Sequence, residues 1–399
     1  MTATKPPVSN GLTAVGIHIF SGLFTRGLAD VGFDVKCTLE DGKFGVATHR
    51  LNFPGAPVFD DPGHWPIEDL KGIDLVYSNS ACAGFSTASQ SKGLESESNN
   101  QLKLAHDTAV KLRPKAYVVE SVANLFKDGD PLVRQWETQW AELGYKTTRV
   151  IEDALHLGLA QRRRRALFVA TRENFCPAYP SRHERPATVA DAIYDLRAAP
   201  ANIAEKPYNQ PVQYPECQAL SWYAAELRNA GTGTTWHASP KPSHAMMSLI
   251  PYSKPGQRLQ EMSDDIMRET YWKHKQGKKP TGRPGLLNRR LAYDTPGYTL
   301  TGGCHWIHPE FDRYITVREK ARLMGVPDNF EFASASLHDA YAEVGKAVSP
   351  IVGRWIGAQL AESLNGRHQT HVPVVDFTRP AAPVIRKKDL QTDNNHDTE

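Results

Sequence analysis

Short apolar runs alternate with helix-like segments from Leu12 to about Thr171 of this chain. The apolar runs, which we expect to be strands, are Ala14–Phe20, Asp34–Leu39, Leu75–Asn79, Ala116–Glu120, Thr147–Ile151 and Ala166–Ala170. Helices fit between them, for example at Asn100–Leu112 and Leu132–Leu143. Strands separated by helices in this way form β-α-β units around a mostly parallel sheet. The alternation therefore predicts an α/β fold.

The character of the sequence changes after Glu173. Up to about Arg290 it is rich in prolines, aromatic residues and loop formers, which predicts a smaller, irregular domain. Helical character returns at Val317–Met324 and again after Pro350, so we expect the last ordered segment to pack back on the first domain. The predicted divisions are a flexible N-terminus (1–10), an α/β domain (11–174), the irregular domain (175–290), a segment that completes the first domain (291–370) and a disordered tail (371–399).

The composition restricts the class of protein. With 399 residues, 40% apolar and 23% charged, the chain is typical of a soluble globular protein large enough for two cores. The net charge of +3 is too small to indicate a polyanionic partner by itself. Five widely spaced cysteines without a C-x-x-C pair indicate neither a disulfide framework nor a metal site. The N-terminus lacks the apolar core of a signal peptide. We expect a cytoplasmic protein, of a prokaryotic cell or a virus-infected host, without membrane contact.

One cysteine, Cys82, follows closely on the apolar run that ends at Asn79, in a string of small and polar residues. This places the thiol on a loop at the carboxyl end of a strand, where open α/β sheets bind their ligands. The next apolar run delivers Glu120 to the same edge. A thiol and a carboxyl group that face one substrate indicate nucleophilic catalysis. Each residue alone also has a plainer interpretation, because an isolated cysteine is usually a buried apolar side chain.

A glycine turn follows the first predicted strand, in the string Ile17-His18-Ile19-Phe20-Ser21-Gly22. Small residues at such a turn let a nucleotide-type cofactor approach the backbone, although a turn without a ligand has the same sequence. Glu40 ends the next strand about twenty residues on, where a carboxylate accepts hydrogen bonds from ribose hydroxyls in such folds. Together they indicate a nucleotide-type cofactor site.

A basic run, Arg162-Arg163-Arg164-Arg165, leads directly into the predicted strand at Ala166. A solvated basic turn is the ordinary interpretation of such a charge run. Because successive strand residues point to opposite faces, alternate arginines would share one face and could reach a phosphate or a base edge.

Together and in this order, these strings resemble the cytosine-C5 DNA methyltransferase family, from about Gly16 to Leu364. Cys82-Ala83-Gly84-Phe85-Ser86 is similar to the family's Pro-Pro-Cys-Gln-Gly-Phe-Ser nucleophile loop, and Glu120-Ser121-Val122 to its Glu-Asn-Val. Gln161, Arg163 and Arg165 fit Gln-x-Arg-x-Arg. Downstream, Arg313–Asp328 is similar to Arg-x-Leu-Thr-x-Arg-Glu-x-Ala-Arg-Leu-x-Gly-Phe-Pro-Asp, and Val344–Pro350 to Val-Gly-Asn-Ala-Val-x-Pro.

The resemblance implies a Rossmann-like fold that uses S-adenosylmethionine, with a target-recognition domain at 175–290. The residues that it assigns to the cofactor are Phe20, Ser21, Gly22, Leu23, Glu40, Asp41, Asp61 (or Asp60), Lys346, Ala347 and Val348. It assigns contacts with double-stranded DNA to Ser86, Gln161 and Arg163, and catalysis to Cys82, Glu120, Arg163 and Arg165. We expect a monomer that binds no metal.

The chemistry that the resemblance implies begins with addition of the Cys82 thiolate to C6 of a cytosine flipped out of the duplex. Glu120 holds a proton toward N3, which stabilises the electron-rich adduct, and C5 then attacks the donor carbon. Arg165 grips the base carbonyl, and Arg163 serves a phosphate or loop closure. Loss of the C5 proton and elimination of Cys82 complete the reaction.

Lys346 stands where the family has asparagine, in the motif next to the donor. Because S-adenosylmethionine already carries a sulfonium and an ammonium, a further cation within about 4 Å would cost roughly 1 to 4 kcal/mol. A carboxylate on the transferred carbon would turn this repulsion into attraction. The lysine thus suggests carboxy-S-adenosylmethionine as donor and 5-carboxymethylcytosine as product.

Three different interpretations stay open. Lys346 could turn outward and pair with Glu343, which leaves a conventional methyltransferase that makes 5-methylcytosine. A flipped cytosine can also come from RNA, so the second is an RNA cytosine methyltransferase. The third is a DNA-binding homologue without catalysis, because Ser80-Ala81 replace Pro-Pro before the cysteine.

Overall fold

The fold is taken from a computed structural model, which describes residues 8–40, 45–80, 83–85, 96–179, 185–216, 220–274, 282–285, 287–368 and 370–377. Its centre is an eight-stranded sheet in the order β14-β6-β7-β5-β4-β1-β2-β3. The strands are β1 (Thr13–Ile17), β2 (Asp34–Leu39), β3 (Val58–Phe59), β4 (Leu75–Ser78), β5 (Ala116–Val122), β6 (Lys146–Asp153), β7 (Arg164–Thr171) and β14 (Val374–Asp376). Only β7 runs antiparallel to its neighbours, so the predicted α/β fold with a mostly parallel sheet is confirmed.

The two largest differences from the predicted boundaries have local reasons. The first strand ends at Ile17 rather than Phe20, because His18 and Phe20 have positive φ angles of 50° and 54°, which extended backbone does not allow. The sequence predicts a disordered tail from residue 371, but Val374–Asp376 form β14, which adds a parallel edge to β6. Two consecutive β-branched valines favour this extended conformation.

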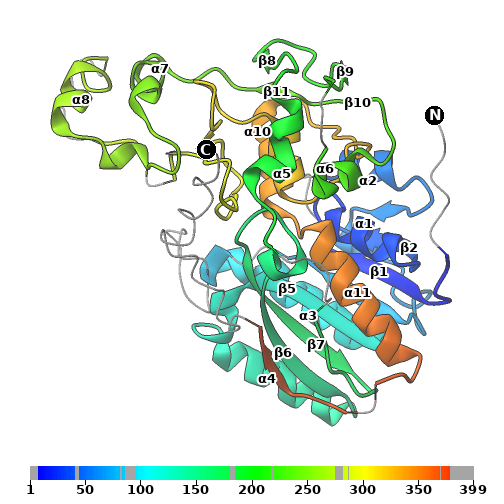
Figure 1. Ribbon diagram of the computed structural model, residues 1–399. Helices are drawn as coiled ribbons and strands as arrows, with labels where there is room; N and C mark the ends of the chain where they lie inside the picture. Colours follow the sequence, from blue (N-terminus) through cyan, green and yellow to red (C-terminus); the bar gives the residue numbers. More distant parts are fainter. Residues whose placement is uncertain are drawn as a thin grey trace, which may run out of the picture.

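Helices cover both faces of the sheet (Figure 1). On one face, α1 (Leu23–Asp30) and α11 (Pro350–Leu364) pack over the apolar side chains of β1, β5, β6 and β7. On the other, α3 (Asn100–Leu112) and α4 (Asp130–Glu142) pack over β4, β5 and β7. Gly27 and Gly353 make the α1–α11 contact close, since a Cβ added at Gly27 would lie 2.5 Å from the Pro350 carbonyl oxygen. This close contact holds α11 against α1 on the eight-stranded sheet.

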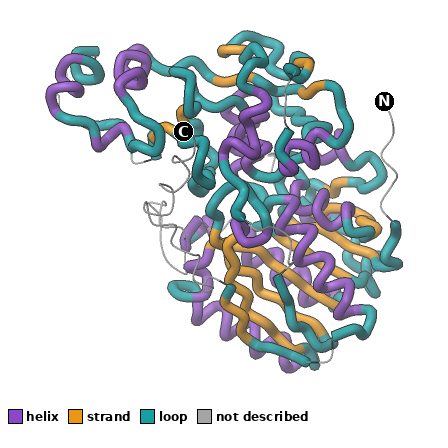
Figure 2. The backbone as a smooth tube through the Cα atoms, viewed as in Figure 1, coloured by secondary structure: helices purple, strands orange, loops and turns teal. Residues whose placement is uncertain are grey.

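The remaining elements are short, and loops dominate this part of the molecule (Figure 2). The helices are α2 (Val46–Asn52), α5 (Val189–Ile193), α6 (Trp222–Arg228), α7 (His244–Leu249), α8 (Asp264–Glu269), α9 (Val317–Leu323) and α10 (Leu337–Lys346). The strands β8 (Asn202–Ile203) to β13 (Trp306–Ile307) form pairs of two residues each, through β9 (Val212–Gln213), β10 (Gly233–Thr234), β11 (Ala238–Ser239) and β12 (Arg289–Arg290). One core joins α5 and α6 to α9 and α10, and a separate small core holds α7 and α8.

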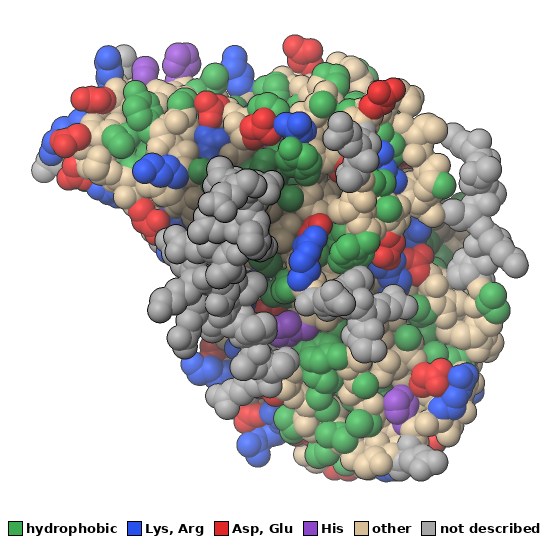
Figure 3. Space-filling model, in the orientation of Figure 1, with side chains coloured by type: hydrophobic (Ala, Val, Ile, Leu, Met, Phe, Trp, Pro, Cys, Tyr) green, Lys and Arg blue, Asp and Glu red, His purple; other side chains and the backbone are tan. Residues whose placement is uncertain are grey.

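The space-filling view shows that the part with α7 and α8 projects as an arm, so that the outline is concave between the arm and the sheet domain (Figure 3). Basic and acidic side chains are mixed on the arm's visible surface. The division of the chain at residues 175 and 291 stays a prediction. One core joins α5, which lies between these two boundaries, to α9 and α10, which lie after residue 291.

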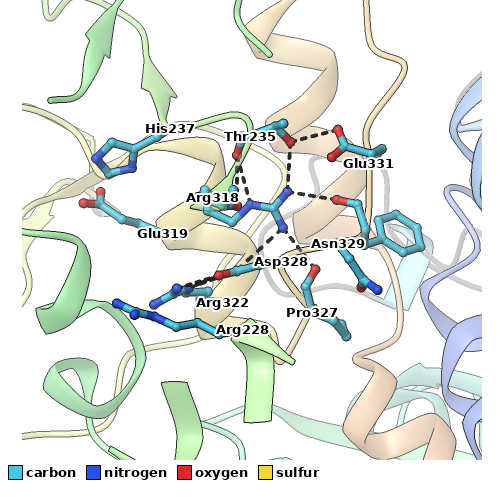
Figure 4. Close-up of polar contacts among 12 residues, drawn as sticks. Arg228, Thr235, His237, Arg318, Glu319, Arg322, Pro327, Asp328, Asn329 and Glu331 are labelled. Atoms are coloured by element: carbon cyan, nitrogen blue, oxygen red, sulfur yellow. Dashed lines mark hydrogen bonds and ion pairs between the residues drawn. The ribbon is translucent and has the colours of Figure 1, made fainter. Parts of the chain in front are cut away.

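Two arginines of α9, Arg318 and Arg322, belong to a buried network of charged and polar groups that holds this helix in place (Figure 4). The guanidinium of Arg322 is fully buried and lies 2.5 Å from a carboxylate oxygen of Asp328 and 2.5 Å from one of Asp195. Arg318 donates to the backbone carbonyls of Thr235, Pro327 and Phe330. Because a buried charge is costly unless it is paired, this part of the Arg313–Asp328 motif is structural in character.

Candidate functional site

The sheet order places its central strands at a switch point. From β1 the chain continues to β2 on one side, while β4 and then β5 lie on the other side. In open α/β sheets, ligands bind outside the carboxyl ends of the strands at such a point. His18 to Gly22, Glu40 and Asn79 lie at this edge because they follow β1, β2 and β4, and Glu120 lies there because it is two residues before the end of β5.

On the β2 side, the buried carboxylate of Glu40 faces the turn after β1. Its Oε2 accepts from the backbone N–H of Phe20 at 3.3 Å, and its Oε1 lies 3.5 Å from Nδ1 of His18. Gly22 caps the N-terminus of α1 and has a φ of 86°, which favours glycine. Asp61 follows β3 at the same edge, where it accepts from the Gly63 backbone and lies 2.7 Å from Nδ1 of His64. These hydrogen bonds lower the pKa of its exposed carboxyl group.

The neighbouring Asp60 pairs with Arg50 at 2.9 Å. Leu23 is buried in the first turn of α1, where it joins the apolar core. The Ser21 hydroxyl donates to the backbone carbonyl of Glu343 at 3.4 Å, so the turn after β1 contacts α10. The carboxyl group of Glu343 accepts from Thr48 at 2.6 Å and from Ser334 at 2.7 Å. Burial raises its pKa.

On the β5 side, Glu120 lies buried between two partners. Its Oε1 is 2.9 Å from Nε of Arg165, and its Oε2 accepts from the side-chain amide of Asn79 at 2.8 Å. Burial raises the pKa of Glu120, and the positive charges of Arg165 and Arg163 oppose that shift. The carboxyl group can therefore exchange a proton nearer neutral pH than an exposed glutamate. The sequence did not single out Asn79, although its place at the end of an apolar run was visible.

Several predicted site residues lie outside the described residues. They are Cys82, Ser86 and Asp41, with Ala81 of the same loop. The described residues do place both sides of the cysteine loop: the Ser78 and Ser80 hydroxyls lie 2.7 Å apart at the end of β4, and Phe85 is buried. The assignment of Cys82 as nucleophile stays a prediction.

Gln161 and Arg163 point into the protein. The side chain of Gln161 donates to the carbonyl of Leu323 at 2.7 Å and accepts from the backbone N–H of Leu300 at 2.9 Å. Arg163 is 2% exposed, and its guanidinium donates to three backbone carbonyls, those of Leu300, Gly345 and Ala347. This geometry ties the end of α10 to the sheet. The contacts with DNA that the resemblance assigned to Gln161 and Arg163, and the role in loop closure that it allowed for Arg163, stay predictions.

Lys346 is the last residue of α10, and its side chain is exposed. A Cβ added at Gly302 would lie 3.3 Å from its Cε, so the aliphatic stem packs over the loop at Gly302. Arg163 holds the carbonyls on both sides of this lysine. Ala347 and Val348 are buried in the two cores that meet here.

Sequence reasoning also missed Glu152, a fully buried carboxyl group on β6. The string Ile151-Glu152-Asp153 reads as a polar strand end, and only the strand pairing shows that it is covered. Within the described ranges, no group of His, Cys, Asp and Glu could hold a metal ion. Among the same residues, none of the helices combines the length and apolarity needed to cross a bilayer.

The fold and this edge define an α/β enzyme with a nucleotide-type cofactor side and a buried Glu–Arg pair beside it. The family model for C-5 cytosine-specific DNA methylase matches residues 16–362. The chain belongs to that family, and it is an enzyme of this type.

Relatives match most of the chain. The type II methyltransferase M.XorII of Xanthomonas oryzae is 27% identical over 88% of this chain and 85% of its own length. M.AgeI of Thalassovita gelatinovora is 24% identical over 86% and 97%. Among solved structures, a candidate DNA modification methyltransferase encoded within an E. coli prophage has a TM-score of 0.69 at 19% identity, covering 89% of this chain and 99% of its own. That structure supports the fold.

Proposed function

We propose that this enzyme transfers a carbon group to C5 of a cytosine flipped out of double-stranded DNA, through covalent addition of Cys82 to C6. The observation that carries the proposal is the buried pair of Glu120 and Arg165, where the carboxyl end of β5 meets the amino end of the antiparallel β7. A buried carboxyl and a guanidinium match the N3 and carbonyl edge of cytosine, one as proton holder and one as donor.

The roles of the residues follow from the electron demand of the ring. C5 of cytosine is a weak nucleophile, so addition of the Cys82 thiolate at C6 is needed to push electrons toward C5. Glu120, protonated toward N3, stabilises the charge that accumulates in the ring. Arg165 donates to the base carbonyl and balances the same charge. After transfer, loss of the C5 proton re-forms the double bond and expels the thiolate.

The described residues fit an S-adenosylmethionine-type donor. Glu40 is buried at the end of β2 and suits the ribose hydroxyls, while the positive-φ turn at Phe20 and Gly22 leaves backbone open to a ligand. Asp61 stands at the same edge for an adenine amine. When bound, the donor supplies an electrophilic carbon on a sulfonium.

We propose further that the donor carries a carboxylate on the transferred carbon, as in carboxy-S-adenosylmethionine, so that the product is 5-carboxymethylcytosine. The support is Lys346, whose backbone is held on both sides by Arg163 and whose stem lies over the loop at Gly302. A cation fixed beside a sulfonium is unfavourable unless the donor brings a compensating negative charge.

A conventional methyl donor, with 5-methylcytosine as product, is the competing candidate. The exposure of Lys346 favours it, because solvent screens a charge on an exposed side chain from the donor. Glu343, the partner that the sequence suggested for an outward Lys346, accepts hydrogen bonds from Thr48 and Ser334.

Mass spectrometry of nucleosides separates the two donors. Duplex DNA is incubated with the protein and either S-adenosylmethionine or its carboxy derivative. A carboxymethyl gain that depends on the carboxy donor, is lost in Lys346→Asn and is kept in the exposed control Lys71→Asn supports the proposal. A methyl gain from the ordinary donor, unchanged in Lys346→Asn, refutes it and leaves the conventional activity.

Two further measurements test an RNA substrate and a protein without catalysis. Competition between duplex DNA and transfer RNA tests the polymer, and we expect product on DNA alone. Cys82→Ser should abolish turnover while DNA binding persists. Binding without any modified nucleoside from the wild-type protein, with either donor, would instead indicate a non-catalytic homologue.

A further inference from the structure

A second carboxyl group, that of Glu152, is buried beside the Glu120–Arg165 pair. Glu152 lies on β6 and is 0% exposed. Neither of its carboxyl oxygens accepts a hydrogen bond from the part of the chain that the structure describes. A buried carboxyl group without partners is costly, and in a native protein it calls for an explanation.

The strand register places Glu152 on the other side of Arg165 from Glu120. Glu152 is directly opposite Arg165 in the β6–β7 pair, and Glu120 is opposite Leu167 in the β5–β7 pair. Directly opposite residues share a face with Cβ atoms about 4.5 to 5.5 Å apart, and residues two apart on a strand share that face as well. One guanidinium is therefore flanked by two buried carboxyl groups, although it pairs with only one of them.

The charged and titratable groups around Glu152 come from every neighbouring element. They are Asp153 on its own strand, Arg163 and Arg165 at the start of β7, Glu120 on β5 and Tyr179 from the segment after β7. Tyr179 in turn lies near His156, which follows β6, and near Asp376 on β14. Burial raises the pKa of Glu152 well above its ordinary value, and the negative charges of Asp153 and Glu120 add to this effect. Both effects favour the protonated form of Glu152 in the free protein.

The paired state seen here does not suit the chemistry proposed for Glu120. That residue has to hold a proton toward N3 of the base, whereas an ion pair with Arg165 at 2.9 Å favours the ionised carboxylate. Arg165 has to reach the base carbonyl at the same time. Its charge then needs another carboxylate, since its side chain is only 13% exposed.

We propose that Glu152 is a positioning residue that exchanges partners with Glu120. In the free enzyme Arg165 pairs with Glu120 and the proton resides on Glu152. When a cytosine base engages Glu120, Arg165 turns toward the base carbonyl and Glu152, the O–H bond of Glu152 breaks, and Glu120 gains the proton. The three groups keep one proton and no net charge throughout. This inference rests on the function proposed above for Glu120 and Arg165.

The test is the pH dependence of the single-turnover rate in Glu152→Gln. The substitution keeps the shape of the side chain but removes the carboxylate, so Arg165 has only Glu120 as a partner. Glu120 then stays ionised to lower pH, and we expect the alkaline limb of the profile to move toward acid by about one pH unit or more. At a pH on that limb, the rate should fall about tenfold.

Thr148→Val is the matched control. Thr148 is a buried polar residue on the same strand and, four residues away, on the same face. Its profile should coincide with that of the wild type. An unshifted limb in Glu152→Gln, whether or not the rate falls, overturns the proposal, because a purely structural role lowers the rate at every pH. If Glu152→Gln does not fold, Glu152→Asp replaces it. The shorter side chain weakens the exchange, so the alkaline limb of the pH profile should again move toward acid. An unmoved limb in this variant would also overturn the proposal.

The outcome is distinguishable from failure of the proposed function. If C5 transfer itself is wrong, the wild-type enzyme yields no modified cytosine, or Glu120→Gln works as well as the wild type. If only the exchange is wrong, the wild type modifies cytosine, Glu120→Gln is severely slowed, and Glu152→Gln keeps the wild-type limb.

Discussion

The most demanding prediction concerns Arg163. This residue is 2% exposed, and its guanidinium donates to the backbone carbonyls of Leu300, Gly345 and Ala347 at 3.0, 3.2 and 2.9 Å. Replacing it by methionine keeps most of the side-chain length and leaves these three carbonyls without their donor. The substitution should therefore loosen the end of α10 and the backbone on both sides of Lys346.

The magnitude follows from the three bonds. A hydrogen bond to a charged group contributes about 1.5 to 3 kcal/mol, and part of this sum is returned because the guanidinium no longer has to be desolvated. We expect Arg163→Met to lower the free energy of unfolding by about 3 to 5 kcal/mol. At about 2 to 4 °C per kcal/mol for large domains, the Tm should fall by about 6 °C or more.

The assay is thermal unfolding of Arg163→Met beside the exposed neighbour Arg164→Met, with donor binding by calorimetry on both. Arg164→Met should stay within about 0.5 kcal/mol of the wild type, as exposed substitutions usually do. Donor affinity should fall in Arg163→Met alone. Equal stability of the two variants, with reduced DNA affinity in Arg163→Met, would refute the reasoning and restore a direct contact with DNA.

The other predictions concern packing and pH. Gly345→Ala should destabilise the protein by about 1 to 3 kcal/mol in thermal unfolding, since the new Cβ would lie 2.1 Å from the Thr301 carbonyl oxygen. Gly55→Ala is the control, because the space around Gly55 is open. Equal stability of the two variants would contradict the close contact at Gly345. Asp328→Asn should cost about 3 to 5 kcal/mol at pH 7, because it leaves the buried Arg322 short of a counter-charge. Burial acts to raise the pKa of Asp328, but Arg322 outweighs it and lowers that pKa below the ordinary value. The stability from this pair is thus present above the unfolded-state pKa and is lost as the pH falls through the folded-state pKa. Unfolding at pH 7 and at strongly acidic pH should show the wild type losing more stability than Asp328→Asn, and parallel losses would contradict this. The pH dependence of stability has the opposite sign for Glu152, because its pKa is raised on folding. The wild type therefore loses stability as the pH rises from the unfolded-state pKa toward the folded-state pKa. The stability of Glu152→Gln relative to the wild type should increase with rising pH, and a constant difference in Tm would contradict this.

The sheet domain was largely readable from the sequence because its signals are local. Apolar runs of strand length predicted Asp34–Leu39, and the helix at Asn100–Leu112 has the bounds that its pattern indicated. Glu40 and Glu120 could be placed at one edge for the same reason, since each closes or lies within such a run. The early end of β1 required the backbone angles of His18 and Phe20, which no pattern of residue types contains.

The roles of the arginines and of Glu152 depend on contacts between distant parts of the chain. Arg163 and Arg165 are alternate residues of one basic run, yet one reaches carbonyls up to 184 residues away and the other reaches Glu120. The alternation of side chains along a strand predicted that these two arginines share one face, but it could not predict which residues cover that face. Glu152 looked like an ordinary polar strand end, and only the antiparallel register of β7 places Arg165 beside it.

The most direct measurement of the central claim is covalent trapping on duplex DNA that contains 5-fluorocytosine. After addition of a thiolate and transfer of the donor group, a fluorine at C5 cannot leave as a proton does, so the enzyme stays bound to the base. Peptide mapping by mass spectrometry should locate the adduct at Cys82 and leave Cys37, Cys176, Cys217 and Cys304 unmodified. Turnover of ordinary DNA with no adduct, or an adduct at another cysteine, would contradict the account.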